Sequence, residues 1–152
     1  MNKEKGSYFV LVVIIIGMVL AGCQSRPQGP QINIETPWGR PSPKIADAGA
    51  FYMIIRNTGS EPDKLIGGKS SACGMVELHE SYLTAEGAMG MRPVQGGVIE
   101  VPAGGQAELK VGGLHIMCLK KLVDFTPGTK LQLALEFEKS GEKTVDVEIR
   151  QP

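Results

Sequence analysis

Short stretches in which apolar and polar residues alternate fill most of the chain. Residues 75–80 place Val76 and Leu78 on one face and His79 on the other, which is the two-residue period of a half-exposed β-strand. Residues 50–56 are apolar almost throughout, as expected of a central strand that is buried on both faces. The same reasoning predicts further strands at residues 32–34, 98–101, 107–111, 114–119, 131–138 and 143–149.

Turn-forming residues separate these stretches. The chain has 20 Gly and 10 Pro, and Pro102–Gly105 is typical of a turn between two strands. Gly112-Gly113 and Ser140-Gly141 each carry the two-residue signal of a β-hairpin. No segment of the sequence combines a long 3.6-residue period with helix caps. About seven to nine short strands at this spacing predict a single all-β domain, built as a Greek-key sandwich or barrel.

The N-terminus has a different character. Lys3 and Lys5 precede an apolar run from Tyr8 to Leu20, which is shorter than the ~20 residues of a membrane-spanning helix and typical of a secretion signal. The run ends in small residues before Cys23 and resembles a bacterial lipobox. This predicts a lipoprotein signal peptide over residues 1–22 and lipidation of Cys23; the alternative is an uncleaved anchor helix. Both place the rest of the chain outside the cytoplasm and attached to a membrane, in a periplasm or at a cell surface.

The remainder divides into a tether and a domain. Residues 23–31 are polar and contain two prolines, which predicts a flexible tether with no core to bury. Residues 32–152 number about 120 and suit one domain that buries roughly two-thirds of its unfolded surface.

Charge and histidine content exclude several classes of function. Sixteen Lys and Arg balance 16 Asp and Glu for a formal net charge of zero, whereas nucleic-acid-binding domains normally carry a basic patch. We therefore expect no nucleic-acid partner. The chain has only two His residues, and no nucleophile–base pair or phosphate-binding loop is recognisable, so we predict that the protein is not an enzyme.

The histidines and the methionines near them are the candidate chemistry. His115 and Met117 are two residues apart in a predicted strand and share a face, and Met89 and Met91 lie between the His79 strand and the His115 strand. Thioether sulfur with imidazole nitrogen suits Cu(I), whereas zinc sites favour thiolate, imidazole and carboxylate. Thioethers also form no disulfides in an oxidising compartment. Taken singly, a methionine on a strand is more often part of the core, and a lone histidine is more often a surface residue.

The order of these residues and the segments around them resemble the PCu(A)C family of periplasmic copper chaperones, whose members share a His…Met…His-x-Met motif. The resemblance covers nearly the whole domain, and its combination of motifs is more specific than a bare His-x-Met. The matching segments are Pro37-Trp38 with Arg40, Gly49–Tyr52, Arg56–Gly59, Val76–Glu80, Met89–Val94, Pro102–Gly105, Glu108–Lys110, Gly112–Met117, Leu131–Phe137 and Val145–Ile149.

The resemblance implies a cupredoxin-like β-sandwich that binds one Cu(I) ion at an exposed site and passes it to a copper-accepting protein. The usual acceptor in the family is the copper centre of a respiratory oxidase, and a second copper chaperone is another candidate. Carried over by motif, the ligands are His79, Met91, His115 and Met117.

Two spacings depart from the family pattern. One more residue than usual precedes Met91 after the first histidine, and two more follow it before the second. Loops near residues 85–88 and 95–98 can absorb them, but an odd insertion inside a strand would turn the following side chains to the opposite face. Met89 has the same strand parity as Met91 and is therefore the alternative second ligand.

Cys73 and Cys118 remain once Cys23 is assigned to the lipid. In a compartment where disulfides persist they either form a disulfide or stay as two thiols, and both alternatives are open. Strand parity turns Cys118 away from Met117, toward the interior. Binding of a metal by either sulfur is less favoured for that reason.

Two other functions compete with copper delivery. One is a binding or scaffolding lipoprotein without a metal, which fold alone does not exclude. The other is a blue-copper electron carrier, which needs a Cys thiolate beside two His and a Met; the sequence meets this pattern poorly because no His follows Cys118. Glu80 and Arg92 flank the predicted ligands and can guide a partner, although a solvated surface is the favoured interpretation of both.

Overall fold

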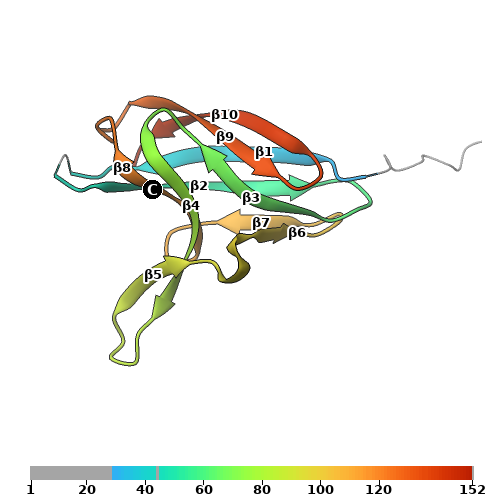
Figure 1. Ribbon diagram of the computed structural model, residues 1–152, viewed down its shortest axis with the longest axis horizontal. Helices are drawn as coiled ribbons and strands as arrows, with labels where there is room; N and C mark the ends of the chain where they lie inside the picture. Colours follow the sequence, from blue (N-terminus) through green and yellow to red (C-terminus); the bar gives the residue numbers. More distant parts are fainter. Residues whose placement is uncertain (1–28, 44, 152) are drawn as a thin grey trace, which may run out of the picture.

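The computed structural model describes residues 29–43 and 45–151 (Figure 1). Within these ranges the chain forms β-strands and one short 3₁₀ turn, η1 (Gln95–Gly97), and no α-helix. The predicted all-β class is therefore confirmed, with more strands than expected. They are β1 (Ile32–Arg40), β2 (Ala48–Asn57), β3 (Asp63–Lys69), β4 (Cys73–Leu83), β5 (Met89–Pro93), β6 (Ile99–Val101), β7 (Gln106–Leu109), β8 (Leu114–Lys121), β9 (Lys130–Phe137) and β10 (Gly141–Ile149).

The predicted signal peptide and the predicted lipidation site at Cys23 lie outside the described residues. The described part of the chain contains no helix that is long and apolar enough to cross a membrane. The last residues of the predicted tether contact the domain. The backbone N–H of Ser60 donates to Gly29 O at 3.1 Å, and the backbone N–H of Gln31 donates to Asn57 Oδ1 at 2.9 Å. From Gly29 onward the chain therefore packs against the loop that follows β2.

The strands form one sheet that closes around a common interior. Their order is β5-β4-β8-β7-β2-β1-β10-β9-β3-β6, and β8 also pairs with β2. β3 packs beside β4, and β6 lies beside β7 and β2, so the two halves of the sheet face each other as in a sandwich or barrel. The outer part of β4 and β5 leave this body as a hairpin (Figure 1), called here the β4–β5 arm (residues 80–93).

The interior is filled by alternate side chains of nearly every strand. On β4 and β8, the strands that carry the histidines, Leu78, Ile116 and Cys118 face inward and are almost fully buried. Successive side chains of a strand point to opposite faces. The residues between these positions therefore face the outer side of the sheet. Other core residues are Phe51, Met53, Ile55, Leu65, Val101, Leu133, Leu135, Val147 and Ile149.

One of the two predicted hairpins is confirmed and the other is wrong. β9 and β10 pair antiparallel around Ser140-Gly141, with φ of 70° at Gly141. Around Gly112-Gly113, however, β7 and β8 run in the same direction and both pair antiparallel with β2, one after the other along its length. Lys110 N–H donates to Leu114 O at 2.8 Å and Gly113 N–H donates to Lys110 O at 3.0 Å. These bonds close a small loop, after which β8 continues in the same direction as β7. The ten-residue β2 is long enough to pair with both strands.

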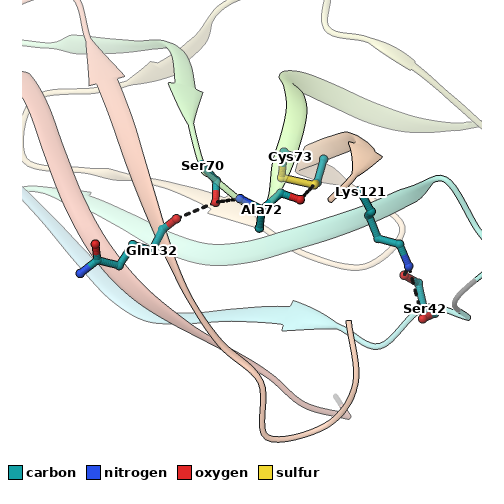
Figure 2. Close-up of a disulfide and its surroundings, with 7 residues drawn as sticks. Ser42, Ser70, Ala72, Cys73, Lys121 and Gln132 are labelled. Atoms are coloured by element: carbon teal, nitrogen blue, oxygen red, sulfur yellow. Dashed lines mark hydrogen bonds between the residues drawn. A yellow bond between two sulfur atoms is a disulfide. The ribbon is translucent and has the colours of Figure 1, made fainter. Parts of the chain in front are cut away.

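A disulfide joins the start of β4 to β8 in the core (Figure 2). Of the two alternatives for Cys73 and Cys118, the structure contains the disulfide, with a Cα–Cα distance of 5.3 Å. Close by, the Ser70 hydroxyl donates to Gln132 O at 2.7 Å and accepts from Ala72 N–H at 3.3 Å. These bonds fasten the β3–β4 turn to β9 beside the disulfide.

Candidate metal site

β4 and β8 hold the two histidines. The antiparallel register of these strands puts His79 directly opposite His115, and the ring centroids are 5.9 Å apart. Leu78 and Ile116 are also direct partners and fill the interior. The alternation of each strand therefore turns both imidazoles to the outer face. Strand alternation in the sequence predicted that His79 lies on the face opposite to Leu78. The structure adds that the His79 and His115 rings lie next to each other.

Each imidazole has one nitrogen with a hydrogen-bond partner and one without. His79 Nε2 lies 2.8 Å from Glu77 Oε2, and His115 Nδ1 lies 3.0 Å from Gly113 O. An ionised carboxylate and a carbonyl only accept, so these nitrogens carry the N–H, and His79 Nδ1 and His115 Nε2 carry the lone pairs. Both lone-pair nitrogens are buried without a hydrogen-bond partner among the described residues. Two lone pairs held in this way are suited to bind a metal ion.

Burial also controls the charge of His115. The residue is only 1% exposed, and burial lowers the pKa of His115 below its ordinary value of 6.5; the Gly113 carbonyl opposes this effect and the neighbouring His79 ring adds to it. The neutral form is the one that binds metal. His115 is therefore ready to bind a metal at lower pH than a free histidine is.

Met117 and Met91 add thioether sulfur to the same face. Met117 follows His115 by two residues on β8 and lies opposite Ala50 of β2, while Met91 of β5 lies opposite Ser81 of β4. Both line one open groove of about 380 Å³, together with residues of the β1–β2 segment. The groove gives solvent access to the thioether side of the site.

Met89, the alternative second ligand, lies farther out on the β4–β5 arm. Along the arm, the cross-strand pairs that share one face are His79 with Pro93, Ser81 with Met91, and Leu83 with Met89. Met91 therefore lies one such pair away from His79, and Met89 lies two pairs away. The lining of the groove includes Met91 and not Met89. On geometry, Met91 is the better placed of the two.

The extra residues in the two spacings lie in turns, outside the paired strands. Residues 84–88 form the β4–β5 turn, in which Thr84 N–H donates to Ala88 O at 2.8 Å, and η1 occupies the second position. Gly96 and Gly97 of η1 have φ of 78° and 70°, which glycine adopts without strain. The β4–β5 register is continuous between the turns, so neither insertion reverses the face of Met91.

An aromatic pair, Tyr52 and Trp38, extends from His115, and the sequence pattern assigns neither ring a role at the site. The Tyr52 ring of β2 is 6.2 Å from the His115 ring, and the Trp38 ring of β1 is 4.7 Å from Tyr52. A bulge in β1 at Thr36, where φ is 48°, shifts the register so that Trp38 pairs with Tyr52. Tyr52 therefore packs against the site on its β2 side, and Trp38 packs against Tyr52. Tyr52 belongs to the almost wholly apolar run at residues 50–56, whose pattern does not indicate which side chains face the outer side of the sheet.

Glu80 and Arg92 form an ion pair with an Nε–Oε1 distance of 2.8 Å. They are cross-strand partners on the arm, with parity opposite to that of His79, and the Arg92 guanidinium lies 4.8 Å from the centre of the Tyr82 ring. These two charges therefore lie on the face of the arm away from the histidines, in agreement with the interpretation of a solvated surface.

The donor set is soft and neutral. A metal ion held about 2 Å from each ring nitrogen lies roughly 3 Å from each ring centre, so rings whose centres are 5.9 Å apart can share one ion. Two imidazoles and two thioethers suit Cu(I). Residues 29–43 and 45–151 contain no group of three or more His, Cys, Asp and Glu side chains that is arranged to hold a metal.

The fold and the site define a domain of the PCuAC type. The apo PCuAC domain from PmoF1 is 26% identical with a TM-score of 0.66, and the match covers 82% of this chain and 100% of that domain. The copper-bound PCuAC domain from PmoF2 is 26% identical with a TM-score of 0.64 and the same coverage. CuI-DR1885 from Deinococcus radiodurans shares the fold at 22% identity and a TM-score of 0.62, over 86% of this chain and 83% of that chain. The predicted resemblance to the PCu(A)C family and the cupredoxin-like β fold are confirmed.

The chain belongs to the LpqE-like family, which is described as a family of lipoproteins and whose profile matches residues 32–149. A relative named as a lipoprotein, Lxx21020 of Leifsonia xyli subsp. xyli, is 32% identical over 109 residues, which is 70% of this chain and 64% of that protein. RP573 of Rickettsia prowazekii is 24% identical over 126 residues, 81% of this chain and 68% of its own. The chain thus spans about two-thirds of the length of these relatives.

Proposed function

We propose that the protein is an extracytoplasmic Cu(I) chaperone that holds the ion between His79, His115, Met91 and Met117. One observation carries the proposal: His79 Nδ1 and His115 Nε2 are buried without a hydrogen-bond partner among the described residues, on two rings whose centroids are 5.9 Å apart. An unpartnered buried polar atom costs about 1–3 kcal/mol. Coordination of one ion by both nitrogens offsets that cost, whereas a domain that binds no metal gains nothing from it.

The similar domains support copper as the cargo. The PCuAC domain from PmoF2 was solved with copper, and DR1885 with Cu(I). In this chain the four proposed ligands occur in the order of the His…Met…His-x-Met motif of the PCu(A)C family. The ligands are neutral in their binding forms, which suits a singly charged soft ion.

The arrangement favours a carrier that releases its ion. The two imidazoles are fixed by hydrogen bonds and burial, whereas Met91 is 57% exposed on the arm and Met117 borders the open groove. An incoming sulfur or nitrogen ligand from an acceptor can replace the exposed thioether first, while the histidines still hold the ion. Copper then leaves by stepwise ligand exchange, with no free ion in solution.

The compartment and the acceptor follow from the resemblance and the N-terminal sequence. We propose lipidation at Cys23, with residues 23–31 as the tether, in agreement with the lipoprotein names of the family and of a relative. The proposed acceptor is the copper centre of a respiratory oxidase, or a second copper chaperone that serves it. The disulfide suits an oxidising compartment.

A blue-copper electron carrier is disfavoured by the same disulfide. Such a centre requires a Cys thiolate as a ligand. Cys118 is bonded to Cys73 and is fully buried in the core, on the face of β8 opposite to Met117. No thiolate is therefore available on the histidine side of the sheet from these two residues.

Competition for Cu(I) against a bathocuproine-type chelator tests the proposal. The wild-type protein is compared with His115→Ala/Met117→Ala, and Lys110→Ala in the loop between β7 and β8 serves as a matched control on an exposed ion pair with Glu108. We expect the double variant to lose measurable competition and the control to retain it. Equal affinity of the double variant and the wild type would overturn the proposed site.

A further inference from the structure

Glu77 lies between the proposed ligands without being one of the motif residues. It is on β4, two residues before His79 on the same face, and directly opposite Met117 in the β4–β8 register. Its side chain is 34% exposed, and Oε2 lies 2.8 Å from His79 Nε2. The carboxylate is therefore next to one imidazole and one thioether of the site.

The hydrogen bond from His79 to Glu77 determines which nitrogen of His79 can bind a metal. A neutral imidazole has one N–H and one lone pair. The contact with an ionised carboxylate requires the N–H at Nε2 and leaves the lone pair at Nδ1, the buried nitrogen without a partner among the described residues. In the other tautomer the N–H would point into the site, where it cannot coordinate. The ring also gains a fixed orientation from this bond.

The other groups around His79 do not supply this hydrogen bond. Pro93 lies opposite it on β5 and has no N–H or side-chain polar atom, and His115 faces it from β8. The charges of Glu80 and Arg92 are paired with each other on the opposite face of the arm. By contrast, the tautomer of His115 is set by the backbone carbonyl of Gly113, which no side-chain substitution removes.

We infer that Glu77 is a positioning residue that holds His79 in the Nε2–H tautomer and so presents Nδ1 to the copper ion. This inference rests on the proposed function for its copper readout, but the tautomer itself is a property of the metal-free protein. Partners of this kind typically change metal affinity by about 10–100-fold when they are removed.

Long-range ¹H–¹⁵N correlation spectra of the imidazoles in the metal-free protein, at mildly alkaline pH, test the inference. We expect the wild type to show a protonated Nε2 and an unprotonated Nδ1 at His79. Glu77→Ala should lose this preference. Glu77→Gln should keep it, because the amide oxygen accepts the same hydrogen bond. Glu80→Ala, on the neighbouring carboxylate of the opposite face, is the matched control and should change nothing at His79.

Cu(I) affinity of the same variants completes the test. Glu77→Ala should weaken binding by about 10–100-fold, and Glu77→Gln should recover most of that loss. An unchanged His79 tautomer in Glu77→Ala overturns the inference, as does unchanged affinity in that variant. If the tautomers behave as expected but the wild type does not compete for Cu(I), the proposed function fails while the role of Glu77 in orienting His79 stands.

Discussion

Removal of the Cys73–Cys118 disulfide has an effect whose size follows from the sequence separation of 45 residues. In the chain-entropy description, a loop of this length stabilises the folded state by about 4 kcal/mol through its effect on the unfolded chain. A domain of about 120 residues unfolds with an entropy of about 0.25 kcal/mol/K. The double variant Cys73→Ala/Cys118→Ala should therefore melt about 16 °C below the wild type. Alanine is the suitable replacement because serine would bury two hydroxyls in an apolar core.

Thermal unfolding followed by circular dichroism, with and without a reducing agent, measures this difference. Reduced wild type should melt near the double variant, and the double variant should not respond to the reductant. Since seven residue pairs hold β4 on β8, the folded double variant should bind Cu(I) about as tightly as the wild type. A melting temperature equal to that of the oxidised wild type would refute the reasoning, because it would mean that the bond does not constrain the unfolded chain.

Three further predictions concern single residues. Met91→Leu should weaken Cu(I) binding in a chelator competition, whereas Met89→Leu, one step farther along the arm, should not; the reverse order would make Met89 the ligand. Because burial lowers the pKa of His115, the His115 imidazole of the metal-free protein should titrate below the ordinary histidine value of 6.5 in an NMR pH series, and a midpoint at or above that value would contradict the burial argument. Asp63 is buried and accepts three backbone N–H bonds. Burial raises the pKa of Asp63, but the bonds from Ser140 and the backbone outweigh this and lower the pKa below 3.8. Its stabilising effect is therefore complete above about pH 4 and is lost as pH falls through the lowered pKa. Asp63→Asn should lower the free energy of unfolding, measured in urea, by about 1–3 kcal/mol at neutral pH and by little in strong acid. An equal loss at neutral pH and in strong acid would contradict this prediction.

The two-residue period was sufficient to predict most strands and the outward face of both histidines. Leu78 precedes His79 and Ile116 follows His115, and both apolar side chains are buried. Because successive side chains of a strand point to opposite faces, the two histidines must face outward. Strand parity also predicted that Cys118 points inward, which the disulfide requires. These are local properties, and each can be worked out from a few consecutive residues.

Pairing between distant strands could not be predicted in this way. Gly112-Gly113 carries a hairpin signal, yet it forms a loop because β2 accepts β7 and β8 in succession. The partner of His79 is likewise a matter of register: a shift of one residue on β8 would place Ile116 opposite it. Glu77 shares the face of His79 by strand parity, but no pattern in the sequence indicates a role for it, because its contact with His79 depends on side-chain conformation.

X-ray absorption spectroscopy of the Cu(I)-loaded protein tests the proposed ligand set most directly. The spectrum reports the numbers of nitrogen and sulfur atoms bound to the ion and the outer-shell signature of imidazole. Ligation by His79, His115, Met91 and Met117 predicts two imidazole nitrogens and two sulfurs. A shell of sulfur alone, or one without sulfur, would contradict the site proposed on the outer face of β4, β8 and β5.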